Sequence, residues 1–201
     1  MTTVQGTFSR RAPKQQRSRQ TVDAVLEAVP LVVKRYGARA ITTNRIAEVA
    51  GVSVGSLYQY FPDKRAIFAA LHDRHVDDVR QVIGRTMAAC ASAPLQEFTR
   101  ELVRGLVDLH MDAADLHEIV SSFVPDGALG FKTALHHTFG RVLSPANQRR
   151  YSLDETERML FVLPGLVESL VHGAAHQARV LSRDAAGSEA IRTVQVYVNS
   201  F

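Results

Sequence analysis

Several residue types and motifs that mark whole classes of protein are scarce or missing in this 201-residue chain. Cys90 is the only cysteine, so no disulfide can form within the chain, as is usual in a reducing cytoplasm. It continues an apolar helical face, which predicts a small buried side chain, with a regulatory thiol as the alternative. No apolar run approaches the roughly 20 residues of a membrane span. Ser9-Arg10-Arg11 lacks the apolar segment that follows an export signal, so we expect a cytoplasmic protein that makes no membrane contact.

Signatures of catalysis and of metal binding are absent from the sequence. It contains no Gly-x-Ser-x-Gly elbow, no phosphate loop and no thiolate–imidazole motif, and its carboxylates are scattered over helix surfaces. His172 and His176 are four residues apart, yet two histidines without a placed carboxylate or thiolate make only half of a metal site. We therefore expect no enzyme activity, no catalytic residue, no metal and no cofactor.

Strand signals are sparse, and apolar residues recur instead at helical spacing. No Asn-Gly or Asp-Gly turn lies between alternating apolar runs. The pattern predicts an all-α fold of about nine helices. Pro30 and Pro164 fall inside two of them, and each is expected to kink or break its helix because proline removes a backbone hydrogen bond. The expected helices include residues 17–36, a helix from Lys64, residues 129–143 and 154–180, and a last helix from about Ser188.

Charge is distributed unevenly along the chain. Residues 1–65 contain 11 Lys and Arg against 4 Asp and Glu, a balance of +7, whereas the remaining residues have a balance of −3. This is the electrostatic pattern of a polyanion-binding head on a neutral to acidic body. Residues 1–16 are expected to form a flexible basic arm, which either touches DNA or is a solvated tail.

The most informative pattern lies between Ile41 and Lys64. Thr42 or Thr43 is placed to cap a first helix, and Gly51 tolerates the left-handed backbone that ends it. Ser53 is placed to cap a second, short helix, which Pro62 ends. Two short helices joined by a tight turn form a helix-turn-helix, whose second helix can enter the DNA major groove.

An ordinary helical hairpin inside an all-α core is the alternative interpretation of this stretch. Two features favour DNA binding: the flanks are basic, and the outer face carries hydrogen-bonding groups rather than a mixture of Lys and Glu. That outer face consists of Thr43, Asn44, Ser56, Tyr58, Gln59 and Tyr60.

The same stretch resembles a known family. The matching residues are Gly37, Thr42-Thr43, Ile46-Ala47, Ala50-Gly51-Val52-Ser53, Gly55, Leu57-Tyr58, Tyr60-Phe61 and Lys64. They are similar to the DNA-binding domain of the TetR family of bacterial transcriptional regulators, over about residues 17–72. The rest of the chain matches that family only in length and helical pattern, and Pro30 departs from its usual first helix.

The resemblance implies roles for individual residues in DNA binding. Val54 is expected to contact a thymine methyl, and Gly55 allows close approach of the backbone. Tyr58 and Tyr60 are expected to bind phosphates, and Lys64 to form a phosphate site with the amides that begin its helix. Few long side chains reach base edges, so phosphate contacts and DNA shape should dominate. The predicted DNA-binding residues are Thr43, Asn44, Arg45, Ser53, Val54, Gly55, Ser56, Tyr58, Gln59, Tyr60 and Lys64.

The resemblance also implies an apolar effector pocket and a homodimer interface in the body, with completion of the monomer core as the alternative for both sets. The expected pocket residues are Phe98, Leu102, His110, His117, Phe123, Phe139, Phe161 and Glu168. The expected interface residues are Phe161, Leu166, Leu170, Ala174, Val194 and Val198.

Taken together, the sequence predicts a basic arm at 1–16, a DNA-binding domain at 17–63 with its motif at 41–60, and a helical ligand-binding and dimerisation domain at 64–201. The expected function is that of a repressor on double-stranded DNA with an approximately palindromic operator, released by a small apolar effector. The alternative is an architectural or adaptor DNA-binding protein that responds to no effector. The operator sequence, the regulated genes and the identity of the effector are not encoded in these patterns.

Overall fold

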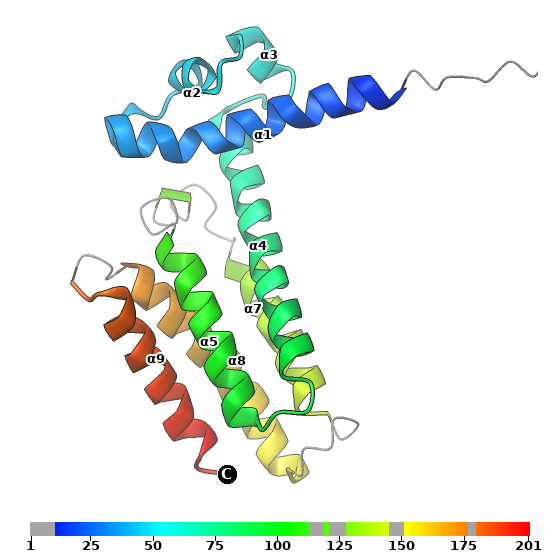
Figure 1. The fold of residues 1–201 in the computed structure, drawn as a ribbon, viewed down its shortest axis with the longest axis vertical. Helices are drawn as coiled ribbons and strands as arrows, with labels where there is room; N and C mark the ends of the chain where they lie inside the picture. Colours follow the sequence, from blue (N-terminus) through cyan, green and yellow to red (C-terminus); the bar gives the residue numbers. More distant parts are fainter. Residues whose placement is uncertain (1–10, 113–118, 121–127, 145–150, 177–179) are drawn as a thin grey trace, which may run out of the picture. The chain divides into compact units, whose positions relative to one another are not determined.

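The computed structural model describes residues 11–112, 119–120, 128–144, 151–176 and 180–201. Within these ranges all regular elements are helical, as the sequence predicts. They are α1 (Arg11–Tyr36), the 3₁₀ turn η1 (Ala38–Ala40), α2 (Thr43–Ala50), α3 (Val54–Tyr58), α4 (Lys64–Ala89), α5 (Leu95–Asp112), α7 (Ala128–Val142), α8 (Leu153–His176) and α9 (Arg183–Val198) (Figure 1). Residue contacts divide the chain into two compact units, Met1–Ala70 and Leu71–Phe201, which we call the head and the body. The boundary between them falls inside α4.

The head is built on one apolar face of α1. Val25, Leu26, Val29 and Val32 recur at helical spacing and are all buried. This face packs against α2 and α3, which are too short to be stable helices by themselves. The head core is completed by Ile41, Ile46, Ala47, Leu57, Phe61, Ile67 and Phe68.

Two helices continue through a proline. α1 begins at Arg11 rather than at the expected residue 17 and runs unbroken past Pro30 to Tyr36. Pro30 is exposed, so water can satisfy the carbonyl that loses its helical partner. α8 likewise continues through Pro164, which is buried. Neither proline breaks its helix.

In the body, α5 and α8 make the central contacts. α5 packs against α8 and α9, and α8 also packs against α7 and α9. α4 approaches α5 closely at Gly105, where an added Cβ would lie 2.9 Å from Cγ1 of Val82, so a side chain there would displace α4. Cys90 is buried against this core, as the sequence predicts.

Polar contacts fix α9 against α5. The Gln195 side-chain amide donates to the backbone carbonyl of Gln96 at 2.8 Å and to the Thr99 hydroxyl at 2.9 Å. α9 begins at Arg183, earlier than the expected Ser188, because the hydroxyl of Ser182 caps it by accepting from a first-turn amide.

A histidine cluster joins four helices of the body. His75 on α4 and His110 on α5 lie with their Nε2 atoms 3.1 Å apart, and His110 is fully buried. The His110 ring also contacts Phe131 of α7 and His172 of α8, each with a centroid separation of 5.2 Å. Nδ1 of His110 lies 2.8 Å from the Leu106 carbonyl, which can only accept, so Nδ1 carries a proton. In the neutral ring Nε2 is then an acceptor, and His75 donates to it.

The expectation that no segment reaches the composition of a membrane span is wrong for α8. This helix has a mean hydropathy of 1.3 over an 18-residue window. It is also a core helix, because Met159, Leu163, Val167 and Val171 are fully buried in the body. Its high hydropathy arises because its exposed side carries apolar residues as well, Phe161 among them.

Candidate nucleic-acid interface

α2 begins and ends at residues that the sequence indicates. The Thr42 hydroxyl accepts a hydrogen bond from the backbone N–H of Arg45 at 3.2 Å, so Thr42 rather than Thr43 is the cap. Gly51 follows the helix with φ 66° and ψ 28°, in the left-handed region, and the N–H of Val52 donates to the Ala47 carbonyl at 3.0 Å. This closure satisfies the last carbonyls of α2 and sets the sharp turn into α3.

α3 is a five-residue helix held by one cap and one buried side chain. The Ser53 hydroxyl accepts from the backbone N–H of Ser56 at 3.0 Å, and the two hydroxyls lie 2.8 Å apart. Leu57 is the buried residue of the helix and has no exposed surface. Val54 and Tyr58 are 37% and 48% exposed. α3 therefore presents an uncharged surface on a single buried anchor.

The two tyrosines predicted to bind phosphate have different hydroxyl partners. The Tyr58 hydroxyl lies 3.1 Å from that of Thr43, which links α3 to α2, and either group can donate. The Tyr60 hydroxyl donates to Ser18 of α1 at 3.1 Å. The Tyr58 hydroxyl can therefore donate to a further acceptor while it accepts from Thr43, whereas the Tyr60 hydroxyl already donates to Ser18.

Arg45 is engaged within the head. Its guanidinium carbon lies 4.6 Å from the centre of the Tyr36 ring, and Nη1 pairs with Glu48 at 3.1 Å. These contacts hold the guanidinium charge of Arg45 beside a carboxylate. Asn44, the next candidate on α2, is exposed.

The start of α4 is partly used by the protein itself. The Asp63 carboxylate accepts from the backbone N–H of Ala66 at 2.8 Å, as the sequence predicts for a cap. The Lys64 ammonium donates to the Ile41 carbonyl at 3.4 Å. A phosphate at this helix terminus would therefore lie beside the Asp63 carboxylate and share Lys64 with the backbone, so this position favours anions less than the sequence suggests.

The sequence did not indicate two supporting residues of this surface, Ser18 and Tyr36. Both lie on α1 and contact side chains outside this helix, Tyr60 and Arg45. No local motif encodes such pairs. The basic charge of α1 and its proximity to the motif were the available signals.

Four of the six predicted pocket residues that the structure describes are core residues. Phe98, Leu102, His110 and Phe139 are at most 1% exposed, and the rings of Phe98 and Phe139 meet edge to face at a centroid distance of 6.4 Å. These four complete the core, which is the alternative that the sequence left open. Phe161 is 86% exposed on α8. His117 and Phe123 lie outside the described residues.

Glu168, the last predicted pocket residue, is half-buried on α8. Burial raises the pKa of its carboxyl, and the nearby charges of Lys132 and His136 on α7 lower it in part.

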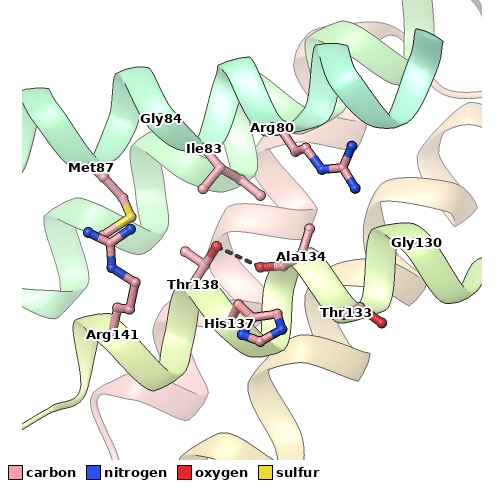
Figure 2. Close-up of a pocket in the computed structure, with 10 residues that line it drawn as sticks. All are labelled: Arg80, Ile83, Gly84, Met87, Gly130, Thr133, Ala134, His137, Thr138 and Arg141. Carbon is pink, nitrogen blue, oxygen red and sulfur yellow. Dashed lines mark hydrogen bonds between the residues drawn. The ribbon is translucent and has the colours of Figure 1, made fainter. Parts of the chain in front are cut away.

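The body has a groove between α4 and α7 with a volume of about 550 Å³. None of the predicted pocket residues lines it. Its lining residues are Arg80, Ile83, Gly84, Met87, Gly130, Thr133, Ala134, His137, Thr138 and Arg141 (Figure 2).

The predicted dimer residues divide into two groups. Val194 and Val198 are at most 1% exposed and Ala174 is also buried, so these side chains belong to the core of the protomer. The inclusion of the two valines in an interface is corrected, because a fully buried side chain has no surface to offer a partner. Leu166 and Leu170 are half-buried, and Phe161 is exposed. The exposed Leu153 and Val196, which the sequence did not single out, add apolar surface to α8 and α9.

The arrangement of α2 and α3 agrees with a known domain. Residues 32–71 match the family described as bacterial regulatory proteins, tetR family. The head is a TetR-family domain. This TetR-family match includes both helices of the motif and the start of α4.

Curated relatives match part of this chain. The nucleoid occlusion factor SlmA of Glaesserella parasuis is 30% identical over 113 residues, which are 55% of this chain and 52% of SlmA. SlmA of Haemophilus ducreyi is 45% identical over 51 residues, 25% of each chain. The chain thus spans about half, or less, of the length of these relatives.

Solved structures share the whole TetR-family fold. A TetR-family transcriptional regulator from Streptomyces coelicolor is 18% identical with a TM-score of 0.63, covering 90% of this chain and 98% of its own. The TetR-like regulator LfrR from Mycobacterium smegmatis, in complex with proflavine, is 21% identical with a TM-score of 0.58, covering 89% and 96%. At these identities the likeness concerns the fold.

Proposed function

We propose that this TetR-family protein is a sequence-specific DNA-binding regulator of transcription, a repressor that a small-molecule effector releases from its operator. The observation that carries the proposal is α3, a capped short helix with one buried anchor and an uncharged exposed surface. It lies in a head whose charge balance is +7. Such a helix fits the major groove, and the positive charge attracts the phosphate backbone. A protein with this role acts in the cytoplasm.

The side chains on α3 favour a particular mode of reading DNA. Val54, Gly55 and Ser56 are short, so the helix can approach base edges closely while making few base hydrogen bonds. Gln59, at the end of α3, is the one longer amide available for a base contact. Affinity should therefore come mainly from phosphates, and much of the specificity from DNA shape and from a second copy of the head.

Replacing Tyr58 with phenylalanine is expected to weaken binding to all DNA sequences by about fivefold per head, because the change removes one hydroxyl worth roughly 1 kcal/mol. The ring stays in place, so the path of α3 should not change. A mobility-shift series on a selected operator and on unrelated DNA measures the effect. Tyr58→Phe is a cleaner test than Lys64→Ala, because the Lys64 ammonium also supports the Ile41 carbonyl.

The matched control is Tyr151→Phe, which removes a hydroxyl from the body. It should leave DNA affinity unchanged. Equal affinities of wild type and Tyr58→Phe for both DNAs would contradict the phosphate role of Tyr58. Loss of binding to the operator alone would reassign Tyr58 to base reading.

We further propose that the protein is a homodimer through α8 and α9. The support is the apolar surface that one protomer leaves uncovered, including Leu153, Phe161 and Val196, which are 76%, 86% and 67% exposed. A two-fold dimer places two copies of α3 on half-sites about 34 Å apart, so the operator is an approximate palindrome.

Changing Phe161 to glutamate is expected to convert the dimer into a monomer at micromolar concentration. The side chain is almost fully exposed in one protomer, so the change should disturb pairing without disturbing the fold. Analytical ultracentrifugation measures the state, with Leu31→Glu, an exposed leucine of the head, as the control. A wild-type protein that sediments as a monomer would rule out the dimer.

An effector is proposed to act through α4, the helix that contains the boundary between head and body. The structural relatives LfrR, in complex with proflavine, and SmeT, in complex with triclosan, support this proposal, because both have a fold similar to that of this chain. A ligand that prefers one position of α4 by a few kcal/mol would shift the protein between DNA-binding and released states.

The similarity to SlmA supports a second candidate, a DNA-binding factor in nucleoid occlusion that needs no effector. Genome-wide capture of bound fragments separates the two functions. A few sites upstream of genes favour the repressor, and many sites dispersed over the chromosome favour the occlusion factor.

A further inference from the structure

The groove between α4 and α7 is lined by one glycine of each helix. Gly84 lies on α4 and has no atom of another element within 4 Å of an added Cβ, so the space above it is open. Gly130 lies on α7, where an added Cβ would be 3.3 Å from a methyl group of Val76, so this glycine lets α7 approach α4 closely. Ile83, Met87 and Ala134 provide the apolar surface of the groove (Figure 2). The volume of about 550 Å³ lies within the roughly 300–1,000 Å³ typical of small-molecule sites.

The charges around the groove have one sign. Arg80 and Arg141 extend at opposite ends of the apolar surface, and His137 lies on α7 between them (Figure 2). No carboxylate is among the lining residues. Arg80 pairs through Nη1 with Asp77 at 2.7 Å, and both side chains are more than 60% exposed. A guanidinium has five N–H donors, so this exposed pair does not exhaust Arg80.

We propose that this groove binds an elongated amphipathic organic anion, an apolar chain with a carboxylate at each end. Arg80 marks one end of the groove on α4, and Met87 marks the end where Arg141 lies (Figure 2). These two positions of α4 are two helical turns apart, which corresponds to about 10 Å. A linear dicarboxylate of medium length spans this distance, with its methylenes on Ile83, Met87 and Ala134. The proposal deepens the proposed function, because it names a class of effector and a site on α4, but binding itself requires no DNA.

The ligand series uses three probes that share a chain length. Calorimetric titration of the full-length protein without DNA should show the tightest binding for decanedioate, weaker binding for decanoate, and none for decane-1,10-diol, which is neutral. Arg80→Gln and Arg141→Gln should each weaken the binding of decanedioate by about tenfold, since each removes a charge-assisted contact. Arg104→Gln is the control, because Arg104 forms a similar exposed pair, with Glu101, away from the groove.

A variant that fills the groove with a side chain tests where the ligand binds. Gly84→Leu places a side chain in the open space and should abolish binding while the protein stays folded, since leucine is favoured over glycine in a helix. Gly140→Leu is the matched control: Gly140 is an exposed glycine of α7 with no neighbour within 4 Å, and it does not line the groove.

The outcomes separate this proposal from the proposed function. Equal affinity for decanedioate and decane-1,10-diol, unchanged binding by Gly84→Leu, or no binding by any probe would overturn the anion site. Release of operator DNA by decanedioate in wild type but not in Gly84→Leu would support both proposals. Binding to the groove without an effect on DNA would support the anion site and remove its role as the effector site.

Discussion

Leu57→Ala should abolish specific DNA binding while the body remains folded. Leu57 is the buried residue of α3, has no exposed surface, and accepts through its carbonyl from the backbone N–H groups of Tyr60 and Phe61. Truncation of a fully buried leucine costs about 2–5 kcal/mol. A head of this size has little stability to lose, since small domains are marginal. α3 should therefore detach or the head should unfold.

Two measurements locate the effect of Leu57→Ala. Mobility shifts report the loss of DNA binding, and hydrogen exchange shows whether lost protection is confined to the head. Leu31→Ala is the matched control, because Leu31 is in the head but 55% exposed. Retention of wild-type operator affinity by Leu57→Ala would mean that α3 is not the helix that binds DNA.

His110→Ala should destabilise the body by about 3 kcal/mol, the second large effect. The substitution leaves a cavity among four helices and removes the partner of a buried carbonyl and of His75. Urea unfolding followed by circular dichroism measures the loss. His176→Ala, at the exposed end of α8, should change stability by less than about 0.5 kcal/mol. A similar small change for His110→Ala would show that the histidine cluster does not hold α4 on α5.

Local features of the head could be predicted from the sequence because short-range chemistry determines them. A hydroxyl before a helix, a glycine after it and an aspartate before the next helix act on backbone groups a few residues away. Thr42, Gly51, Ser53 and Asp63 therefore all occupy the predicted positions. The partners of Tyr60 and Arg45 could not be predicted, because they come from α1 and depend on how the helices pack.

The body was harder to predict, because helical periodicity marks a buried face without saying what buries it. Phe98 and Phe139 have the pattern of pocket residues, and Val194 has that of an interface residue, yet all three are in the protomer core. The groove at α4 and α7 depends instead on the side chain that Gly84 lacks. A glycine inside a helix was the one signal of this groove in the sequence, and a search for apolar residues does not find a glycine.

The anchoring of α3 by one leucine has a consequence for how binding preference changes over evolution. Val54, Gly55 and Gln59 are exposed, and none of them is among the buried residues of the head core. Substitutions there should alter which DNA is recognised at little cost in folding, since surface changes are usually within about 0.5 kcal/mol. New specificities can therefore arise by single steps, each through a folded intermediate, provided that Leu57 and the Ser53 cap are retained. The same separation makes α3 a suitable segment for redesigning the operator preference of this protein.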